Sequence, residues 1–327
     1  MKAVCVVLNY NDAETTERLV QRIRSYSCFS HIVIVDNAST DNSWERLLML
    51  QDHKVCVIRA GENGGYGAGN NLGVRYAVEK YDASHVLLCN PDVRFSEDCV
   101  ERMMGIFRRH SDVGVATVRM KDAVYGDIKN GWPLRCFSGE LLAMGPVSRR
   151  VFYSLINYPD SYFNGKKGVY VDVVHGSMLM VDTKAFRKCK GYDEGIFLYQ
   201  EEAVLGQRMK SAGYRTVLIL EQEYQHEHGA SIGRSVKSAV DRQRLREDSV
   251  MFYFRKYLHI GRLRRWVARV WFWGIQAETV FGEAGSRLWT GFPSVRRFRI
   301  QNPVRSWLSL PLHKRLATFF LTVQKFM

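Results

Sequence analysis

The sequence of 327 residues lacks the patterns that mark several common classes of protein. Its seven cysteines are odd in number and include no C-x-x-C pair, so we expect reduced thiols and neither a disulfide framework nor a zinc site. No apolar run reaches the ~18 uninterrupted residues of a membrane-spanning helix. The apolar start is broken by polar residues 9–12 and no small-residue cleavage site follows, so we interpret residues 3–8 as a first strand and not as a signal segment.

Two widespread phosphate-binding motifs are also missing. A dinucleotide-binding G-x-G-x-x-G that begins at Gly65 would need glycine at position 70, where Asn70 stands, and no Gly-Lys-Ser/Thr of a P-loop occurs. The glycines of residues 63–71 precede an expected helix, where backbone N–H groups can approach a phosphate or a ribose. The alternative is a flexible loop that binds no ligand.

The net charge of +14 is placed unevenly along the chain. Residues 255–327 hold 14 Lys and Arg and 2 Asp and Glu, which is +12 of the total, so the first 254 residues are nearly neutral. This asymmetry predicts an anionic partner surface for the C-terminal part.

Apolar runs and helical periodicities alternate through the first part of the chain. We expect strands at residues 3–8, 31–35, 55–58, 86–89 and 113–118. We expect helices near residues 15–26, 43–50, 70–80 and 99–107. Alternation of this kind predicts an α/β fold with a mainly parallel sheet. Residues 119–170 are less regular and suggest no chemistry; further strands are expected at 169–174, 178–181 and 216–220.

Acidic residues follow two of these strands. Asp36 ends the second, and Asp92 follows the fourth after Asn90-Pro91. Ligands of open α/β sheets bind at the carboxyl ends of strands, where Asp92 could hold a divalent metal against a phosphate. The competing interpretation is that these residues only form a turn.

Two acidic and two imidazole side chains come later. Glu201 and Glu202 lie in the first turn of an expected helix over residues 201–212, where acids are also favoured by the helix dipole alone. His226 and His228 lie in an expected glycine-containing loop, and one of them could supply a metal ligand.

Four signatures occur in a fixed order, at residues 36–41, 63–73, 90–93 and 191–202. Together they resemble family 2 inverting glycosyltransferases of the GT-A fold, in particular the bacterial rhamnosyltransferase-like branch. The resemblance spans residues 1–235 and implies a catalytic domain there, with a mixed, mainly parallel central sheet. Residues 236–327 would form a basic, aromatic-rich helical extension.

The resemblance implies roles for individual residues. Glu202 would be the general base and Glu201 would support it. The donor nucleotide sugar would be bound by Asn9, Asp36, Asn37, Asn63, Gly65, Asn71, Asn90 and Asp92. Asp193 and Tyr199 would contact the acceptor, while Asp92 and His226 would hold Mg²⁺ or Mn²⁺. Two positions depart from the family pattern, since Asn90 replaces an aspartate of its D-x-D motif and Glu202 replaces the aspartate of its Glu-Asp motif.

The implied activity is transfer of a sugar, best taken as L-rhamnose from dTDP-rhamnose, onto a lipid-linked oligosaccharide or a growing cell-surface polysaccharide. A UDP-sugar donor carrying galactofuranose or a hexose is the alternative, and a catalytically inactive glycan-binding or scaffold subunit is a second one.

The C-terminal extension carries amphipathic patterns at residues 262–275 and 305–325. Basic, aromatic-rich helices of this kind bind anionic membrane surfaces, which together with the resemblance predicts a cytoplasmic protein, peripheral on the inner face of the cell membrane. The alternative is that these apolar residues pack on the catalytic domain or in a homo-oligomer. No nucleic-acid-binding motif is present, so we expect no nucleic-acid partner.

Overall fold

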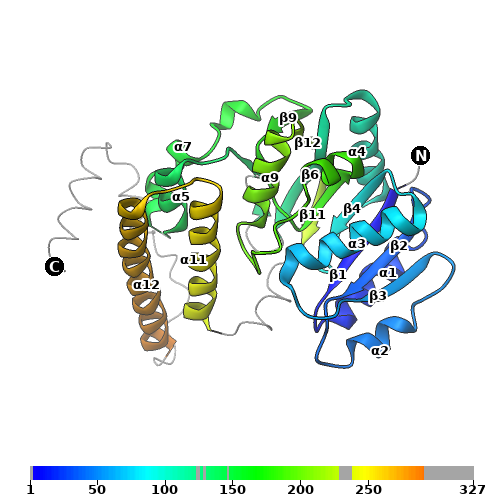
Figure 1. The fold of residues 1–327 in the computed structure, drawn as a ribbon, viewed down its shortest axis with the longest axis horizontal. Helices are drawn as coiled ribbons and strands as arrows, with labels where there is room; N and C mark the ends of the chain where they lie inside the picture. The colour runs from blue at the N-terminus through cyan, green and yellow to red at the C-terminus, as the bar shows by residue number, and fades with distance from the viewer. Residues whose placement is uncertain (1–2, 123–125, 128–129, 146, 228–237, 291–327) are drawn as a thin grey trace.

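The computed structural model describes residues 3–122, 126–127, 130–145, 147–227 and 238–290. Its centre is a mixed, mostly parallel β-sheet with helices on both faces, and a pair of long helices lies at one end of the molecule (Figure 1). The α/β class expected from the sequence is confirmed.

The strands have the following bounds: β1 Ala3–Asn9, β2 Phe29–Asp36, β3 Val55–Arg59, β4 His85–Cys89, β5 Val93–Arg94, β6 Val113–Asp122, β7 Gly126–Asp127, β8 Gly131–Trp132, β9 Gly168–Val171, β10 Val173–Val174, β11 Met178–Asp182 and β12 Arg215–His226. The helices have the following bounds: α1 Ala13–Ile23, α2 Ser43–Leu48, α3 Gly65–Tyr81, α4 Glu97–Arg109, α5 Phe137–Met144, α6 Ser148–Val151, α7 Tyr153–Ile156, α8 Thr183–Lys188, α9 Glu201–Ser211, α11 Ala239–Lys256 and α12 Arg262–Thr290, with a short 3₁₀ turn η1 at Asp160–Tyr162.

The order of the main sheet is β3-β2-β1-β4-β11-β6-β12-β5. Strands β3, β2, β1 and β4 are parallel, whereas β11 runs antiparallel to both β4 and β6. The register pairs Asn9 with Asp36 at the carboxyl ends of β1 and β2, and Val7 with Cys89 at the end of β4. The polar residues that follow these strands therefore meet at one edge of the sheet.

Both faces of the sheet are covered, which explains why the parallel strands are almost entirely apolar. One face packs against α1, α2 and α4 through side chains such as Leu19, Leu47 and Met103. The other packs against α3, α8 and α9 through side chains such as Val74 and Leu205. The result is a three-layer core that holds the strand ends rigidly.

Two expectations about local structure were wrong in their boundaries. Helix α3 begins at Gly65, so most of the expected glycine loop at residues 63–71 is helical. The glycines are needed there because a Cβ at Gly65 would collide with the carbonyl oxygen of Phe197, and Gly65 has φ +86°. His226 ends β12, twelve residues long, and does not lie in a loop.

Helices α11 and α12 pack side by side on α5 and α9 (Figure 1). Ala268, Phe272 and Ile275 of α12 are buried in a cluster with Met144 of α5 and Val204 of α9. The packing alternative for the first amphipathic stretch is thus confirmed for one face of α12. The second stretch, residues 305–325, lies outside the described residues. Within the described chain, no helix combines the length and apolar character that a membrane crossing requires.

Candidate active site

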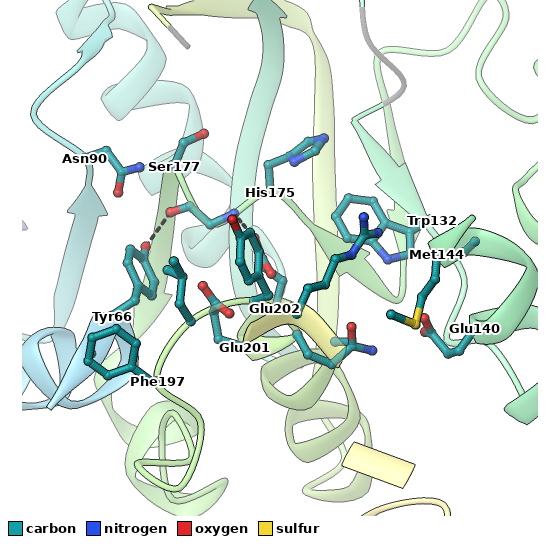
Figure 2. A pocket seen from close by; sticks show the side chains of 18 of the residues that line it. Tyr66, Asn90, Trp132, Glu140, Met144, His175, Ser177, Phe197, Glu201 and Glu202 are labelled. Atoms are coloured by element: carbon teal, nitrogen blue, oxygen red, sulfur yellow. Dashed lines mark hydrogen bonds between the residues drawn. The ribbon is translucent and has the colours of Figure 1, made fainter. Parts of the chain in front are cut away.

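A cavity of about 1040 Å³ opens at the carboxyl edge of the sheet and extends to α5, α6 and α11. Pockets for one small ligand are typically 300–1,000 Å³, so this cavity lies at the large end of that range. Figure 2 shows Glu201 and Glu202 in its middle, with Asn90, Tyr66 and Phe197 on one side and Trp132, Met144 and Glu140 on the other. Eight of the residues assigned to the site from the sequence line this cavity: Asn37, Asn63, Gly65, Asn90, Tyr199, Glu201, Glu202 and His226.

The glutamate pair is positioned by the start of α9. Tyr199 and Gln200, immediately before the helix, both have left-handed backbone, with φ +69° and +68°. Non-glycine residues pay for such conformations, and they concentrate at functional sites. The sharp reversal brings both carboxyl groups of the first turn to the cavity wall.

The two glutamates differ in what surrounds their carboxyl groups. Glu202 Oε1 accepts a hydrogen bond of 3.3 Å from the Gly176 backbone N–H. Glu201 Oε2 is buried and has no hydrogen-bond partner among the described residues. Burial, and then the charge of Glu202, raise the pKa of Glu201 well above its usual range.

Burial also raises the pKa of Glu202, while the N–H groups of its own backbone and of Gly176, and the charge of Arg246, lower it. Two adjacent buried carboxyls do not both ionise readily. Because hydrogen bonds stabilise the charged form of Glu202, we assign the proton of the pair to Glu201 and the negative charge to Glu202. Glu202 is then a carboxylate whose pKa lies closer to neutrality than that of a free glutamate, as a general base requires.

Asp92 and His226 come together from different strands. Asp92 follows β4, and its Oδ1 lies 3.2 Å from Nε2 of His226. The turn is fixed by hydrogen bonds from Asn90 N to Ser177 O (2.8 Å) and from Glu227 N to Asp92 O (2.9 Å). Asp92 itself is 7% exposed and does not line the cavity, whereas Asn90 and His226 do.

In the described part of the chain, no three His, Cys, Asp or Glu side chains form a cluster able to hold a metal. A carboxylate and an imidazole are nevertheless suitable donors for Mg²⁺ or Mn²⁺ when phosphate oxygens and waters supply the other positions. The pair therefore fits a metal that is bound together with its substrate, and it does not form an all-protein metal site.

Residues 63–65 lead from β3 into α3, and Asn37, which follows β2, contacts them. Asn37 Nδ2 donates to Asn63 Oδ1 (2.9 Å) and to Gly65 O (3.2 Å), and Gly65 N donates to Asn63 Oδ1 (3.1 Å). Asn37 Oδ1 is buried in the cavity wall without a hydrogen-bond partner in the described residues. Buried polar atoms are rarely left unpaired, so this oxygen is a candidate acceptor for a ligand N–H or O–H group.

Asn9 and Asp36 lie beneath this wall and do not line the cavity. Asp36 is fully buried, accepts hydrogen bonds from Asn9 Nδ2 (3.1 Å) and Ser39 N (3.2 Å), and pairs with Arg59 at 3.5 Å. Asn9 and Asp36 brace the ends of β1 and β2, and the aspartate has no free edge toward the cavity in this conformation.

Asn71 and Asp193 also lie outside the cavity lining. Asn71 bonds the backbone N and O of Tyr192, each at 3.0 Å. Asp193 pairs with Arg208 at 3.0 Å and Lys256 at 2.7 Å, which ties its loop to α9 and α11. Both residues hold the segment that precedes the glutamate pair.

Several residues that line the cavity were not found from the sequence. Tyr66 donates from its hydroxyl to Gly176 O at 2.6 Å, and Trp132 and His175 stack edge to face at 5.0 Å. Trp132 and His175 lie in or beside irregular stretches, and no local pattern could have identified them. The alternative ligand His228 lies outside the described residues.

Comparisons with known proteins agree with this geometry. The family model described as Glycosyl transferase family 2 matches residues 4–188. The low-salt glycan biosynthesis hexosyltransferase Agl10 of Haloferax volcanii is 25% identical over 201 residues, which cover 60% of this chain; the chain spans only 58% of that relative. The N-acetylglucosaminyl-diphospho-decaprenol L-rhamnosyltransferase of Mycobacterium tuberculosis is 25% identical over 217 residues, 63% of this chain and 69% of the relative.

A solved structure of similar fold is the mannosyltransferase PcManGT of Pyrobaculum calidifontis in complex with GDP-Man and Mn²⁺. It superposes with a TM-score of 0.54 at 14% identity, over 94% of this chain and 83% of that one. The likeness confirms the expected GT-A arrangement of sheet and helices.

Proposed function

The chain belongs to glycosyl transferase family 2, and from this membership we propose that it is a metal-dependent inverting glycosyltransferase of cell-surface glycan synthesis. The observation that carries the proposal is the pair of buried Glu201 and half-buried Glu202, which faces a cavity walled by the polar ends of the parallel strands.

The proposed reaction is a single displacement. Glu202 accepts the proton of an acceptor hydroxyl while that oxygen attacks the anomeric carbon of the donor sugar. The bond from this carbon to the diphosphate breaks, the nucleoside diphosphate leaves, and the configuration inverts. Glu201, kept protonated by burial, leaves Glu202 as the acceptor of the proton.

The donor end of the cavity is the strand edge with Asn37, Asn63 and Asn90. Asp92 and His226 would hold Mg²⁺ or Mn²⁺ there. When bound, such an ion neutralises negative charge on the leaving diphosphate. We take dTDP-L-rhamnose as the donor, supported by the rhamnosyltransferase named above, with a UDP-sugar of galactofuranose or a hexose as the alternative.

We propose further that residues 1–235 form the catalytic unit and that 236–327 form its basic helical extension, peripheral on the inner face of the cell membrane. One side of α12 supports this, since Leu263, Trp266, Val270 and Trp273 are 51–79% exposed beside four arginines of the same helix. A Trp266→Ser/Trp273→Ser variant should float less with anionic vesicles, with binding to neutral vesicles as the comparison. Unchanged flotation would contradict this part of the proposal.

The proposed function is tested by the melting temperature of the protein with dTDP, UDP, GDP or CDP, each with and without Mn²⁺. A ligand that binds only the folded state stabilises it by RT ln(1 + [L]/Kd), about 2.7 kcal/mol at 100 times Kd. A metal-dependent rise of the melting temperature with dTDP supports rhamnose transfer. A rise with UDP would instead indicate a UDP-sugar as the donor. No rise with any nucleotide would favour an inactive scaffold.

A further inference from the structure

The end of the cavity that lies away from the strand edge is strongly basic. Four of its lining residues, which we call the arginine cluster, come from separate segments: Arg135 before α5, Arg149 and Arg150 in α6, and Arg246 in α11. Among the described residues that line the cavity, the carboxylates are Glu140, beside this cluster, and Glu201 and Glu202 in the middle. Four positive charges are thus brought to one wall from positions up to 111 residues apart.

The folded chain neutralises this cluster only in part. Arg135 reaches Glu140 only at 4.0 Å, and its other hydrogen bonds go to Ile156 O (2.8 Å) and Asn157 Oδ1 (3.1 Å). Among the described residues, Arg149, Arg150 and Arg246 form no ion pair with a carboxylate.

Burial and then the charge of Arg149 lower the pKa of the Arg246 guanidinium, Glu140 and Tyr199 raise it, and Arg135 lowers it, although arginine stays charged at neutral pH. Burial likewise lowers the pKa of Arg135. The carboxyl groups of Glu140 and Glu202 offset only part of the repulsion among four cations, so an anion bound in the cavity would stabilise the cluster further.

The position of the cluster separates it from the donor end. In Figure 2 the glutamate pair lies between Asn90 and Tyr66 on one side and Trp132, Met144 and Glu140 on the other. The far side also has apolar wall residues, among them Met144 and Ile156. An acceptor that enters from this side would present its hydroxyl to Glu202 and its remaining part to arginines and apolar side chains.

We propose that the arginine cluster is an anion-binding subsite for an acceptor whose sugar is joined to an apolar chain through a phosphate or diphosphate. Arg149, Arg150 and Arg246 contact the phosphate oxygens, and Met144 and Ile156 receive the first part of the apolar chain. Guanidinium groups suit this role because their N–H donors match phosphate in a bidentate manner. The inference rests on the proposed function, since it assigns this end of the cavity to the acceptor.

The test is the affinity of the full-length protein for geranyl diphosphate, measured by titration calorimetry in EDTA so that a metal-bridged donor site does not contribute. Geraniol and inorganic pyrophosphate are the comparison ligands. We expect geranyl diphosphate to bind at least about tenfold more tightly than either (~1.4 kcal/mol per tenfold).

The variant Arg149→Gln/Arg150→Gln changes two exposed side chains, so the fold is retained. It should lose at least about tenfold in affinity for geranyl diphosphate. Arg108→Gln removes an exposed arginine of α4 outside the cavity and should stay within about twofold of the unmodified protein. Arg246→Gln should weaken binding as well, and Arg246→Lys, which restores the charge, should recover part of it.

The inference would be overturned if geraniol bound as tightly as geranyl diphosphate, or if the double variant bound geranyl diphosphate with unchanged affinity. It would also be overturned if pyrophosphate bound as tightly as geranyl diphosphate, because the site would then be one for a free anion. Loss of dTDP–Mn²⁺ binding in parallel with loss of geranyl diphosphate binding would also overturn it, because the arginines would then serve the donor. If no nucleotide binds while geranyl diphosphate binding still depends on the arginines, the anion subsite stands and the proposed glycosyl transfer fails.

Discussion

Replacement of Glu202 by glutamine removes the proposed base with little change of shape. The amide can keep one oxygen near the Gly176 N–H, which lies 3.3 Å from Glu202 Oε1. It cannot take a proton from an acceptor hydroxyl. The side chains of Asn37 and Asn63 at the strand edge, where the nucleotide is proposed to bind, are held by each other and by Gly65, so we expect nucleotide binding to survive the change.

The expected fall in kcat follows from the role of Glu202 as a general base. A positioned general base typically contributes 10²–10⁴-fold, and each tenfold equals about 1.4 kcal/mol. We therefore expect kcat of Glu202→Gln to fall by about 10²–10⁴-fold, while its affinity for the nucleotide with Mn²⁺ changes by less than about threefold.

The same change should alter stability in a pH-dependent way. The pKa of Glu202 is raised from 4.5 in the folded protein, so the folded state binds this proton more tightly than the unfolded one. The stability that this group contributes is present below pH 4.5 and is lost as the pH rises through the folded pKa. Glutamine does not titrate, so the melting temperature of Glu202→Gln minus that of the unmodified protein should increase from pH 4.5 towards neutrality.

The assay is release of nucleoside diphosphate in the presence of acceptor, with melting curves over the same pH range. Glu45→Gln is the matched control, because Glu45 is an exposed glutamate at the start of α2, and it should change neither property. Retention of more than a tenth of kcat in Glu202→Gln, with nucleotide binding intact, would refute the assignment of the base.

Three further changes test the surroundings of the base. Glu201→Gln should retain more activity than Glu202→Gln and leave the acidic limb of the kcat/KM profile in place, since Glu201 is already uncharged where Glu202 titrates; a limb shifted to lower pH would contradict the assignment of the proton to Glu201. Asp92→Asn should weaken Mn²⁺-dependent nucleotide binding by about 10–100-fold and leave metal-free binding unchanged, and equal loss in EDTA would rule out metal ligation. Gly65→Ala should lower the free energy of unfolding by about 2–4 kcal/mol, from positive φ and collision with the loop before α9, whereas Gly61→Ala, with nothing within 4 Å, should be nearly neutral.

The parts of this fold that could be predicted are those that a short stretch of sequence determines. The short apolar run Val86–Cys89 followed by Asn90-Pro91 predicts a buried strand and its end, and β4 indeed stops at Cys89. The helix that starts at Glu201 is predicted by Leu205 and Met209, which recur at helical spacing, and α9 indeed begins at Glu201.

The start of α3 was placed five residues late because glycines usually weaken helices. At Gly65 the requirement is set by Phe197, which is 132 residues away in sequence, so no local pattern reveals it. For the same reason the sequence did not reveal that Asn71 and Asp193 support the loop before α9. Their side chains bind segments that only the folded chain brings near, and a motif cannot distinguish a residue that touches a ligand from one that supports it.

The short loop before α9 explains why the C-terminal helices matter to the active site. Left-handed backbone at Tyr199 and Gln200 costs roughly 1–3 kcal/mol at each residue, so contacts on either side must hold the loop in place. On one side Tyr66 N donates to Phe197 O at 3.0 Å.

On the other side Ser249 of α11 donates from its hydroxyl to Leu198 O at 2.6 Å, and Lys256 of the same helix pairs with Asp193 at 2.7 Å. Helix α11 therefore holds the loop that orients Glu202, although it lies beyond residue 235. Removal of residues 236–327 would remove both the support of that loop and any membrane-binding face. Loss of activity in such a truncation would therefore not test whether the protein binds membranes. Substitution of the exposed Trp266 and Trp273 leaves these hydrogen bonds intact, and it separates membrane binding from support of the catalytic base.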